Sequence, residues 1–411
     1  MIIFVMLLLM IFNPISLLIS IYGVIKTPKQ WRRFYPILIV SIGMLAYHLP
    51  EIFNGDLSRY FVYLDSFSEM TFSQSVQYLN DKLYVENLLF WIVAKSSDYH
   101  VLPAITTATV YAVMIYITCD SAEVFGKEKY IPITLAVQLS CLPFGLIVEN
   151  VRNISSFAVV ILAIYLDIFK RKKDIWILIL YVLPCFMHSS AIILLLIRIT
   201  IKLTNKFKTV FLAGMMGIPF IIDILYEHNE IWEKSGILKN IFFTVIKSAY
   251  VYLHSSSEWT LIVQESTLQN VLKIIVSLLA FLMLVYLYGN GVKYIAQKGI
   301  NAEYQTLICI LCVIVLLCNV FPGTVYWRFS ATCMIVSGPM LIGLTSKAEK
   351  KIEISQICRF GIYGLSLCKL ILQYFDFKNI SVVKWIFDFS IYNVYYVGFG
   401  FLAKTIMNIF L

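Results

Sequence analysis

The chain has little charge for its length. Only 14% of its 411 residues are charged, whereas a soluble domain carries about 25%. Hydrophobic residues make up 60% of the sequence, and the mean hydropathy is +0.82. This composition excludes an ordinary globular enzyme and a disordered chain, and it argues against nucleic-acid binding. It indicates a chain that lies mostly in lipid, where the net charge of +9 is explained by basic residues that anchor cytoplasmic loops.

The sequence also lacks the motifs of nucleotide and metal chemistry. It contains no P-loop, no glycine-rich dinucleotide turn, no H-E-x-x-H and no D-x-D pair. Most of its cysteines lie inside apolar runs, where a thiol behaves as a small hydrophobe. Cys309 and Cys312 have C-x-x-C spacing but no second pair of ligands. We therefore expect no cofactor and no metal, and a substrate that arrives within or beside the membrane.

Basic clusters set the direction of the chain. Residues 26–33 and 170–173 are rich in lysine and arginine, so both are expected in the cytoplasm. The apolar segments between them must then cross the membrane an even number of times. Residues 83–94 are the segment least suited to crossing, and they are interpreted as a short helix at the outer face. The pattern predicts an all-α polytopic membrane protein with about 12 transmembrane helices. Residues 1–411 are expected to form a single transmembrane domain, with exterior loops at about 50–82 and 227–266.

Residues 175–201 are apolar, but both of their ends look cytoplasmic. Two full spans need about 40 residues, more than this segment contains. A short re-entrant hairpin of two helices satisfies both facts, with its tip at residues 184–190. The alternative is one long span followed by an exterior basic loop. Irregular backbone at depth must be buried in protein or line a wet cavity, so His188 at this tip becomes a candidate site residue.

Ionisable residues away from the cytoplasmic loops are the most informative ones, because charge near the bilayer is costly and tends to be functional. Four groups of them are expected in the outer half of the protein, and the last group overlaps a tight exterior turn expected at residues 322–327. They lie at residues 56–60, 149–153, 188–190 and 326–328.

Arg59, Arg152 and Arg328 break the positive-inside rule in this topology. The planar guanidinium binds phosphate through two parallel hydrogen bonds and stays charged at any relevant pH. Together these arginines favour a site for a lipid-linked diphosphate. The alternative is that each one snorkels to the headgroups or pairs with an acid, the candidates being Asp56, Glu86 and Glu149.

His188 has a side chain suited to proton transfer, although a lone histidine in an apolar run is often a satisfied core residue. Asp56 and Glu149 are the other candidate bases, and each can equally be the partner of an arginine. Tyr60 and Trp327 are candidates for stacking on the faces of sugars.

These elements, in this order over about residues 50–335, resemble the EpsG/Wzy group of polysaccharide polymerases. The resemblance rests on D-x-x-R-Y (Asp56, Arg59, Tyr60), a downstream acid (Glu86), N-x-R-N (Asn150, Arg152, Asn153), F-x-H-S-S-A around His188, and Arg328 after an aromatic pair. Asn153 departs from the commoner N-x-R-Q form, which leaves the role of that position open.

The resemblance implies a metal-independent glycosyltransferase on the outer face of the bacterial cytoplasmic membrane. It would join oligosaccharide units carried on undecaprenyl diphosphate into O-antigen, capsule or exopolysaccharide, with a chain-length regulator as a possible partner. Arg152 and Arg328 would hold the diphosphate with Arg59 as a third cation, and Asn150 would lie beside them. His188 would act as a base or orient the acceptor, and Asp56 would orient an arginine or the acceptor.

Two other functions compete with this one. A flippase or sugar transporter predicts an internal repeat and polar residues along both halves of a central path. A membrane acyltransferase would leave the exterior arginines without an explanation.

Overall fold

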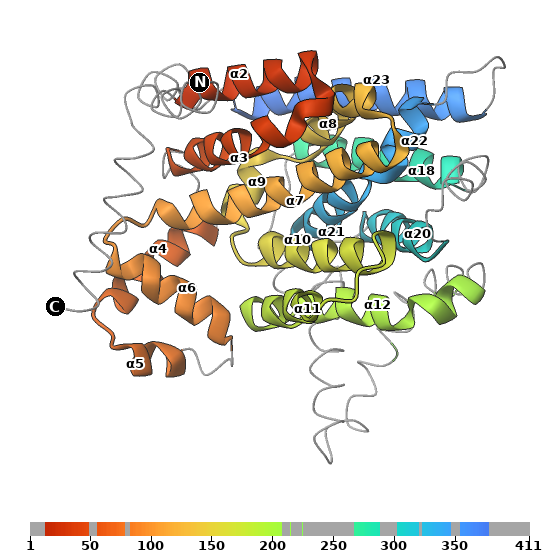
Figure 1. Ribbon diagram of the computed structural model, residues 1–411. Helices are drawn as coiled ribbons and strands as arrows, with labels where there is room; N and C mark the ends of the chain where they lie inside the picture. Colours follow the sequence, from red (N-terminus) through yellow and green to blue (C-terminus); the bar gives the residue numbers. More distant parts are fainter. Residues whose placement is uncertain are drawn as a thin grey trace. The chain divides into compact units, whose positions relative to one another are not determined.

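The computed structural model describes residues 13–48, 56–78, 83–207, 214, 224, 267–287, 302–319, 323–346 and 354–377. Helices and short connections make up these residues, and no strand occurs among them, which confirms the all-α prediction (Figure 1). Their contacts divide them into two compact units. Unit 1 takes the described residues within Met1–Arg198, Met334–Glu349 and Gln373–Leu411, and unit 2 takes those within Ile199–Cys333 and Lys350–Leu372.

The helices of unit 1 begin with α2 (Asn13–Lys26), the 3-10 turn η1 (Pro28–Gln30), α3 (Trp31–Tyr47), α4 (Asp56–Ser68), α5 (Phe72–Gln77), α6 (Tyr84–Lys95) and α7 (Val101–Phe125). They continue with the 3-10 turn η2 (Glu128–Tyr130), α8 (Ile131–Cys141), α9 (Phe144–Glu149), α10 (Asn153–Ile164), the π turn η3 (Tyr165–Phe169), α11 (Ile175–Met187) and α22 (Gly338–Ser346).

Unit 2 contains α18 (Thr267–Tyr286) and α20 (Ala302–Cys318). Three helices carry residues of both units, namely α12 (Ala191–Lys206), α21 (Gly323–Val336) and α23 (Ile354–Phe377).

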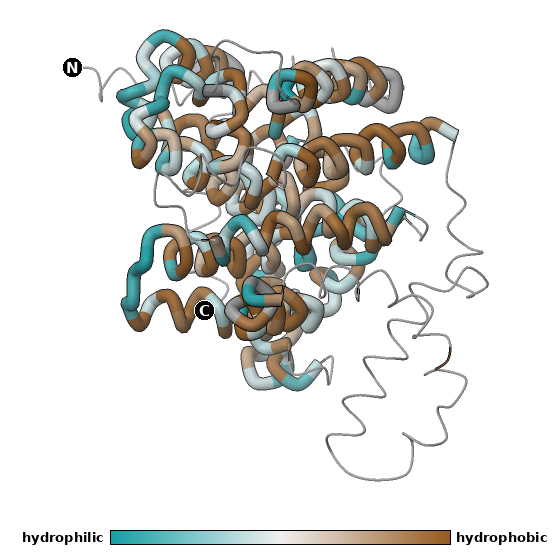
Figure 2. The backbone as a smooth tube through the Cα atoms, turned by 90° about the vertical axis from the view of Figure 1, so that its right-hand side faces the viewer, coloured by the Kyte–Doolittle hydropathy of each residue, from teal (hydrophilic) through white to brown (hydrophobic). Residues whose placement is uncertain are grey.

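Two described helices are long and apolar enough to cross a membrane, Val101–Phe125 and Thr267–Tyr286. Val325–Val336 and Gly338–Thr345 form a third span if they are taken together, although they are bent by 57° at their junction. Other apolar helices, such as α10, α11 and α20, are shorter. In Figure 2 the helices are hydrophobic along most of their lengths, with hydrophilic residues gathered mainly at ends and connections. The count of about 12 spans stays a prediction, and the predicted loop at 227–266 lies outside the described residues.

Helix breaks occur where proline removes a backbone donor. Pro143 separates α8 from α9, and Pro339 follows the first residue of α22. The carbonyl of Met334, near the end of α21, accepts a hydrogen bond from Gln138 Nε2 at 2.8 Å. Thr118 Oγ1 donates to the other side of the same amide, Gln138 Oε1, at 2.7 Å. Buried polar side chains therefore hold α7, α8 and the end of α21 together.

The described part of the predicted exterior loop at 50–82 is folded. It forms α4 and α5, which pack on α6. Tyr60, Leu64 and Phe67 of α4 form a buried cluster with Phe90 of α6 and Val148 of α9, and each of these side chains is at most 1% exposed. This apolar packing fixes the face of α4 that points into unit 1 and so fixes the position of Tyr60.

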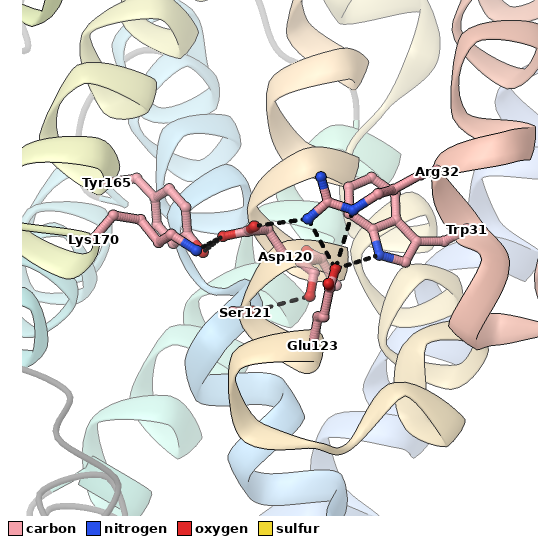
Figure 3. A network of polar contacts seen from close by, with 8 residues as sticks. Trp31, Arg32, Asp120, Ser121, Glu123, Tyr165 and Lys170 are labelled. Atoms are coloured by element: carbon pink, nitrogen blue, oxygen red, sulfur yellow. Dashed lines mark hydrogen bonds and ion pairs between the residues drawn. The ribbon is translucent and has the colours of Figure 1, made fainter. Parts of the chain in front are cut away.

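A polar network joins three elements of unit 1 (Figure 3). Asp120, near the end of α7, has a side chain only 4% exposed and pairs with Lys170 Nζ at 2.9 Å. The same carboxylate accepts a hydrogen bond from the Tyr165 hydroxyl at 2.6 Å and lies 3.6 Å from Arg32. Arg32 also pairs with Glu123 at 3.0 Å. Two acids thus meet two cations, and the network fixes α3, α7 and η3 relative to one another.

Replacing Asp120 with asparagine is expected to lower the free energy of unfolding by about 3 kcal/mol, because it leaves the Lys170 ammonium without its counter-charge. We take the low end of the range for a buried pair, since Lys170 is 25% exposed. The thermal midpoint of the purified chain in detergent measures this loss. Asp174→Asn is the matched control, because Asp174 is exposed and makes no side-chain capping bond. Equal midpoints for the two variants would contradict a structural role for the network.

The segment predicted as a hairpin is broken at residues 188–190, between α11 and α12. Tyr181 of α11 donates to Asp167 Oδ2 at 2.9 Å, and Arg198 of α12 donates to the same oxygen at 2.7 Å. A continuous straight helix would hold Tyr181 and Arg198 about 25 Å apart, beyond what two side chains meeting at one oxygen can reach. The chain therefore folds back after His188, as a hairpin requires, and its depth in a membrane stays a prediction.

Candidate functional site

Arg152 is the centre of a three-helix site in unit 1. It immediately precedes α10, and its Nη1 pairs with Glu86 Oε1 of α6 at 2.5 Å. Its Nε donates to the Tyr60 hydroxyl of α4 at 3.0 Å, and its guanidinium carbon lies 5.0 Å from the centre of the Tyr60 ring. Residues that are up to 92 positions apart in the sequence thus converge on one cation.

The electrostatics of this site keep Arg152 charged. The Glu86 side chain is fully buried, and Arg152 is 24% exposed. Burial opposes the charge of Arg152, but Tyr60 and Glu86 outweigh it and raise the pKa of the guanidinium. Burial also raises the pKa of Tyr60, although Arg152 acts in the opposite direction. Tyr60 is therefore a neutral hydroxyl at physiological pH.

Hydrogen-bond donors remain for a ligand at this site. Arg152 uses Nε and Nη1 for its protein partners, and its Nη2 group has no hydrogen-bond acceptor among the described residues. The Tyr60 oxygen accepts from Arg152, so its own proton is available for donation. A partly exposed guanidinium edge beside a phenolic proton is a suitable arrangement for a phosphate oxygen.

Arg59 and Asp56 extend this site along α4. They form an ion pair one turn apart, and the Arg59 side chain is 57% exposed. Arg59 precedes Tyr60 on the same helix but is exposed, whereas Tyr60 is buried. The structure therefore brings Asp56, Arg59, Tyr60 and Arg152 to one region of unit 1, as the sequence analysis proposed for the first two groups.

The 149–153 group contributes less directly than its spacing implies. Glu149, the last residue of α9, is half-buried, and Arg152 pairs with Glu86 instead. The Asn150 amide donates to the Leu146 carbonyl at 3.0 Å, which caps the end of α9. Asn153 is 1% exposed, and its Oδ1 has no donor among the residues that the structure describes.

His188 ends α11 in an extended conformation. Its Nδ1 accepts a hydrogen bond from the Ser190 backbone N–H at 3.2 Å and lies 2.5 Å from Ser190 Oγ. A backbone donor leaves Nδ1 as the acceptor, so the proton of the neutral ring is on Nε2. In this tautomer His188 is better suited to donate a hydrogen bond that orients a substrate than to act as a general base.

Contacts of its neighbours place His188 at the same end of unit 1 as Arg152. The Phe186 ring lies 5.9 Å from that of Tyr84, the first residue of α6. Met187 Sδ lies 3.9 Å from Ser155 Oγ, in the first turn of α10.

The third arginine belongs to unit 2. The predicted exterior turn at 322–327 is wrong, because α21 begins at Gly323 and carries Trp327 and Arg328 in its first two turns. The Tyr326 hydroxyl donates to the Lys273 carbonyl of α18 at 2.7 Å. Trp327 packs edge-on against Tyr326 at 5.1 Å, and both Trp327 and Arg328 are half-buried.

Sequence reasoning missed two charged residues. Glu86 was among the acids predicted as possible partners of an arginine, and an acid inside a short apolar helix is itself a signal. Lys273 and Lys369 were passed over inside apolar runs, yet they are 4% and 0% exposed. The Lys273 ammonium lies 5.6 Å from the centre of the Tyr326 ring, and that of Lys369 lies 5.4 Å from the centre of the Trp327 ring.

No protein-family model, curated protein or solved structure matches the chain.

Proposed function

We propose that the chain is a membrane glycosyltransferase that polymerises oligosaccharide units carried on undecaprenyl diphosphate. The observation that carries the proposal is the Arg152 site, in which a buried acid and a tyrosine hold a guanidinium and leave its Nη2 edge for an anion. The site lies at the start of α10, and the Asp120 network lies beyond the end of this helix. A helix rises about 27 Å from residue 152 to residue 170, so the site and the network are separated by about that distance. If 170–173 is cytoplasmic, Arg152 faces the outside.

The chemistry of transfer matches what the site offers. The bond between the sugar's anomeric carbon and the diphosphate oxygen breaks, and a bond forms from that carbon to an acceptor hydroxyl oxygen. The departing diphosphate gains negative charge, which Arg152 Nη2 and the Tyr60 hydroxyl would stabilise by donating hydrogen bonds. The acceptor loses its proton, and Asp56 and Glu149 are the candidate bases.

His188 and the membrane arrangement complete the proposal. A donor at His188 Nε2 would orient the acceptor hydroxyl. The hairpin of α11 and α12 would enter the bilayer from the cytoplasm, with its tip at the level of the Arg152 site. About 12 spans would form a single transmembrane domain in the bacterial cytoplasmic membrane, with its active side facing outwards and a chain-length regulator as a partner.

The test of this function is a strain in which the gene is deleted and replaced by the Arg328→Ala variant. We expect normal amounts of the protein in the membrane, with the long polysaccharide ladder reduced to single repeat units that still reach the outer face. A normal ladder would contradict a role for Arg328 in polymerisation. Single units that stay inside, both in the deletion strain and with the variant, would favour a flippase instead.

A further inference from the structure

The connection between η3 and α11 consists of four consecutive basic residues and one acid, Asp174. The first of the four, Lys170, is already paired with Asp120 at 2.9 Å. The other three are exposed, and their side chains have no hydrogen-bond or ion-pair partner among the described residues. We call these three the basic connection; they are Arg171, Lys172 and Lys173. Their charges are available to an anion in the surroundings.

Arg171 has a left-handed backbone conformation, with a φ angle of 54°. The chain turns here as it leaves η3, where the backbone N–H of Lys172 donates to the Leu166 carbonyl at 3.0 Å. Glycine is the usual residue in this conformation, because a side chain is strained there. Backbone strain of this kind is characteristic of segments that bind ligands. An arginine at this position therefore indicates a use for its side chain outside the fold.

An exposed apolar stripe begins directly after the basic connection. It follows one face of α11 at positions i, i+3, i+7 and i+11, and consists of Ile175, Leu178, Val182 and Phe186. Trp176, beside the start of the stripe, is 71% exposed, and tryptophan favours the boundary between lipid headgroups and hydrocarbon. The stripe rises about 17 Å, close to half of the hydrocarbon thickness of about 30 Å. Its length therefore matches the acyl chains of one leaflet.

We infer that the basic connection and Trp176 bind the headgroup of an anionic phospholipid, whose acyl chains lie along the stripe of α11. Three cations favour a headgroup with a net negative charge over a zwitterionic one. A free phosphate or an acidic peptide would contact the cations but not the apolar stripe, so the stripe is the reason for choosing a lipid. This site does not depend on the proposed function.

The bound lipid has a structural consequence for the hairpin. It covers the exposed face of α11, while Tyr181 on the same helix is held by Asp167 of η3. The basic connection joins these two elements directly. Binding of the lipid therefore stabilises the position of α11 against η3.

Native mass spectrometry of the purified full-length chain in a non-ionic detergent measures the binding, with phosphatidylglycerol as the probe and phosphatidylcholine as the zwitterionic comparison. The wild type is expected to bind phosphatidylglycerol more tightly. Replacing all three residues of the basic connection with glutamine should weaken this binding by about 100-fold, because each basic residue near an anionic lipid contributes about 5-fold. Trp176→Ser should weaken it by about 10-fold, through the loss of apolar contact.

A second triple-glutamine variant is the matched control. It removes the same charge from unit 1 at lysines in or beside η1 and η2 instead of next to α11, namely Lys29, Lys127 and Lys129. Its affinity for phosphatidylglycerol should equal that of the wild type. Unchanged affinity in the basic-connection variant, or equal affinity of the wild type for the two phospholipids, would overturn the site.

Arg171→Gly separates the lipid from the fold. Glycine relieves the backbone strain, so the thermal midpoint of the lipid-free chain should rise by about 1–2 °C. Its affinity for phosphatidylglycerol should fall by about 5-fold, because one cation is lost. A lower midpoint together with unchanged affinity would show that Arg171 serves only the fold, and would contradict its assignment to a lipid.

Two further probes test the class of the ligand. Inorganic phosphate that displaces phosphatidylglycerol and binds as tightly would overturn the lipid assignment in favour of a free anion. A glutamate-rich peptide that binds more tightly than phosphatidylglycerol, and equally well to Trp176→Ser, would overturn it in favour of an acidic protein segment. Weak binding of both probes supports the lipid.

Discussion

Arg152→Met is expected to slow polymer formation by about 10²- to 10³-fold, the usual loss when one preorganised donor to a developing anion is removed. Methionine fills similar space but supplies no donor to the departing diphosphate and none to Tyr60. Arg152→Lys should give an intermediate rate. Lysine keeps the positive charge but lacks the planar guanidinium that donates hydrogen bonds to both Tyr60 and Glu86. The measurement is the initial rate of ladder formation from a purified lipid-linked repeat unit.

Arg33→Met is the matched control for this prediction. Arg33 is an exposed arginine of unit 1 whose one side-chain hydrogen bond among the described residues is to Gln30, at 3.1 Å. The rate of this variant should equal that of the wild type. Equal rates for Arg152→Met and Arg33→Met would show that the site does not stabilise the leaving group.

Glu86→Gln is expected to lower the free energy of unfolding by about 3–5 kcal/mol, because it leaves the Arg152 guanidinium without its buried counter-charge. The carboxylate is fully buried and pairs with Arg152 at 2.5 Å, so solvent does not weaken the pair from the Glu86 side. Chemical denaturation of the purified chain in detergent measures the loss.

A double variant separates the structural role of this pair from its catalytic role. Glu86→Leu combined with Arg152→Met replaces both charges with apolar side chains, an exchange that is often neutral for stability. We expect the double variant to regain most of the stability that Glu86→Gln loses, while polymer formation stays as slow as in Arg152→Met. Recovery of both stability and rate would mean that the pair is only a structural element.

The sequence predicts the helical class well, because that class depends on local composition. Apolar runs of helical length define the elements, and the rarity of charge makes Arg59 and Arg152 visible. The break after His188 is also predictable, because basic residues close both ends of an apolar segment too short for two spans.

Pairing between distant residues is not predictable in the same way. Glu149 is three positions from Arg152, yet the partner is Glu86, because α6 packs in one apolar cluster with Val151, the neighbour of Arg152. Lys273 and Lys369 each look like an isolated charge in an apolar run, and only the tertiary contacts place them around one aromatic pair. Pro322-Gly323 has the composition of a turn, but α21 already begins at Gly323.

The single oxygen at Asp167 couples two parts of the site mechanically. Asp167 follows α10, whose first residue lies next to Arg152, and it binds both arms of the hairpin that carries His188. Any sliding of α10 along its axis must either move Arg152 and the hairpin together or break the bonds to Tyr181 and Arg198. The two bonds at Asp167 therefore resist any change in the distance between the Arg152 guanidinium and the His188 imidazole when α10 moves.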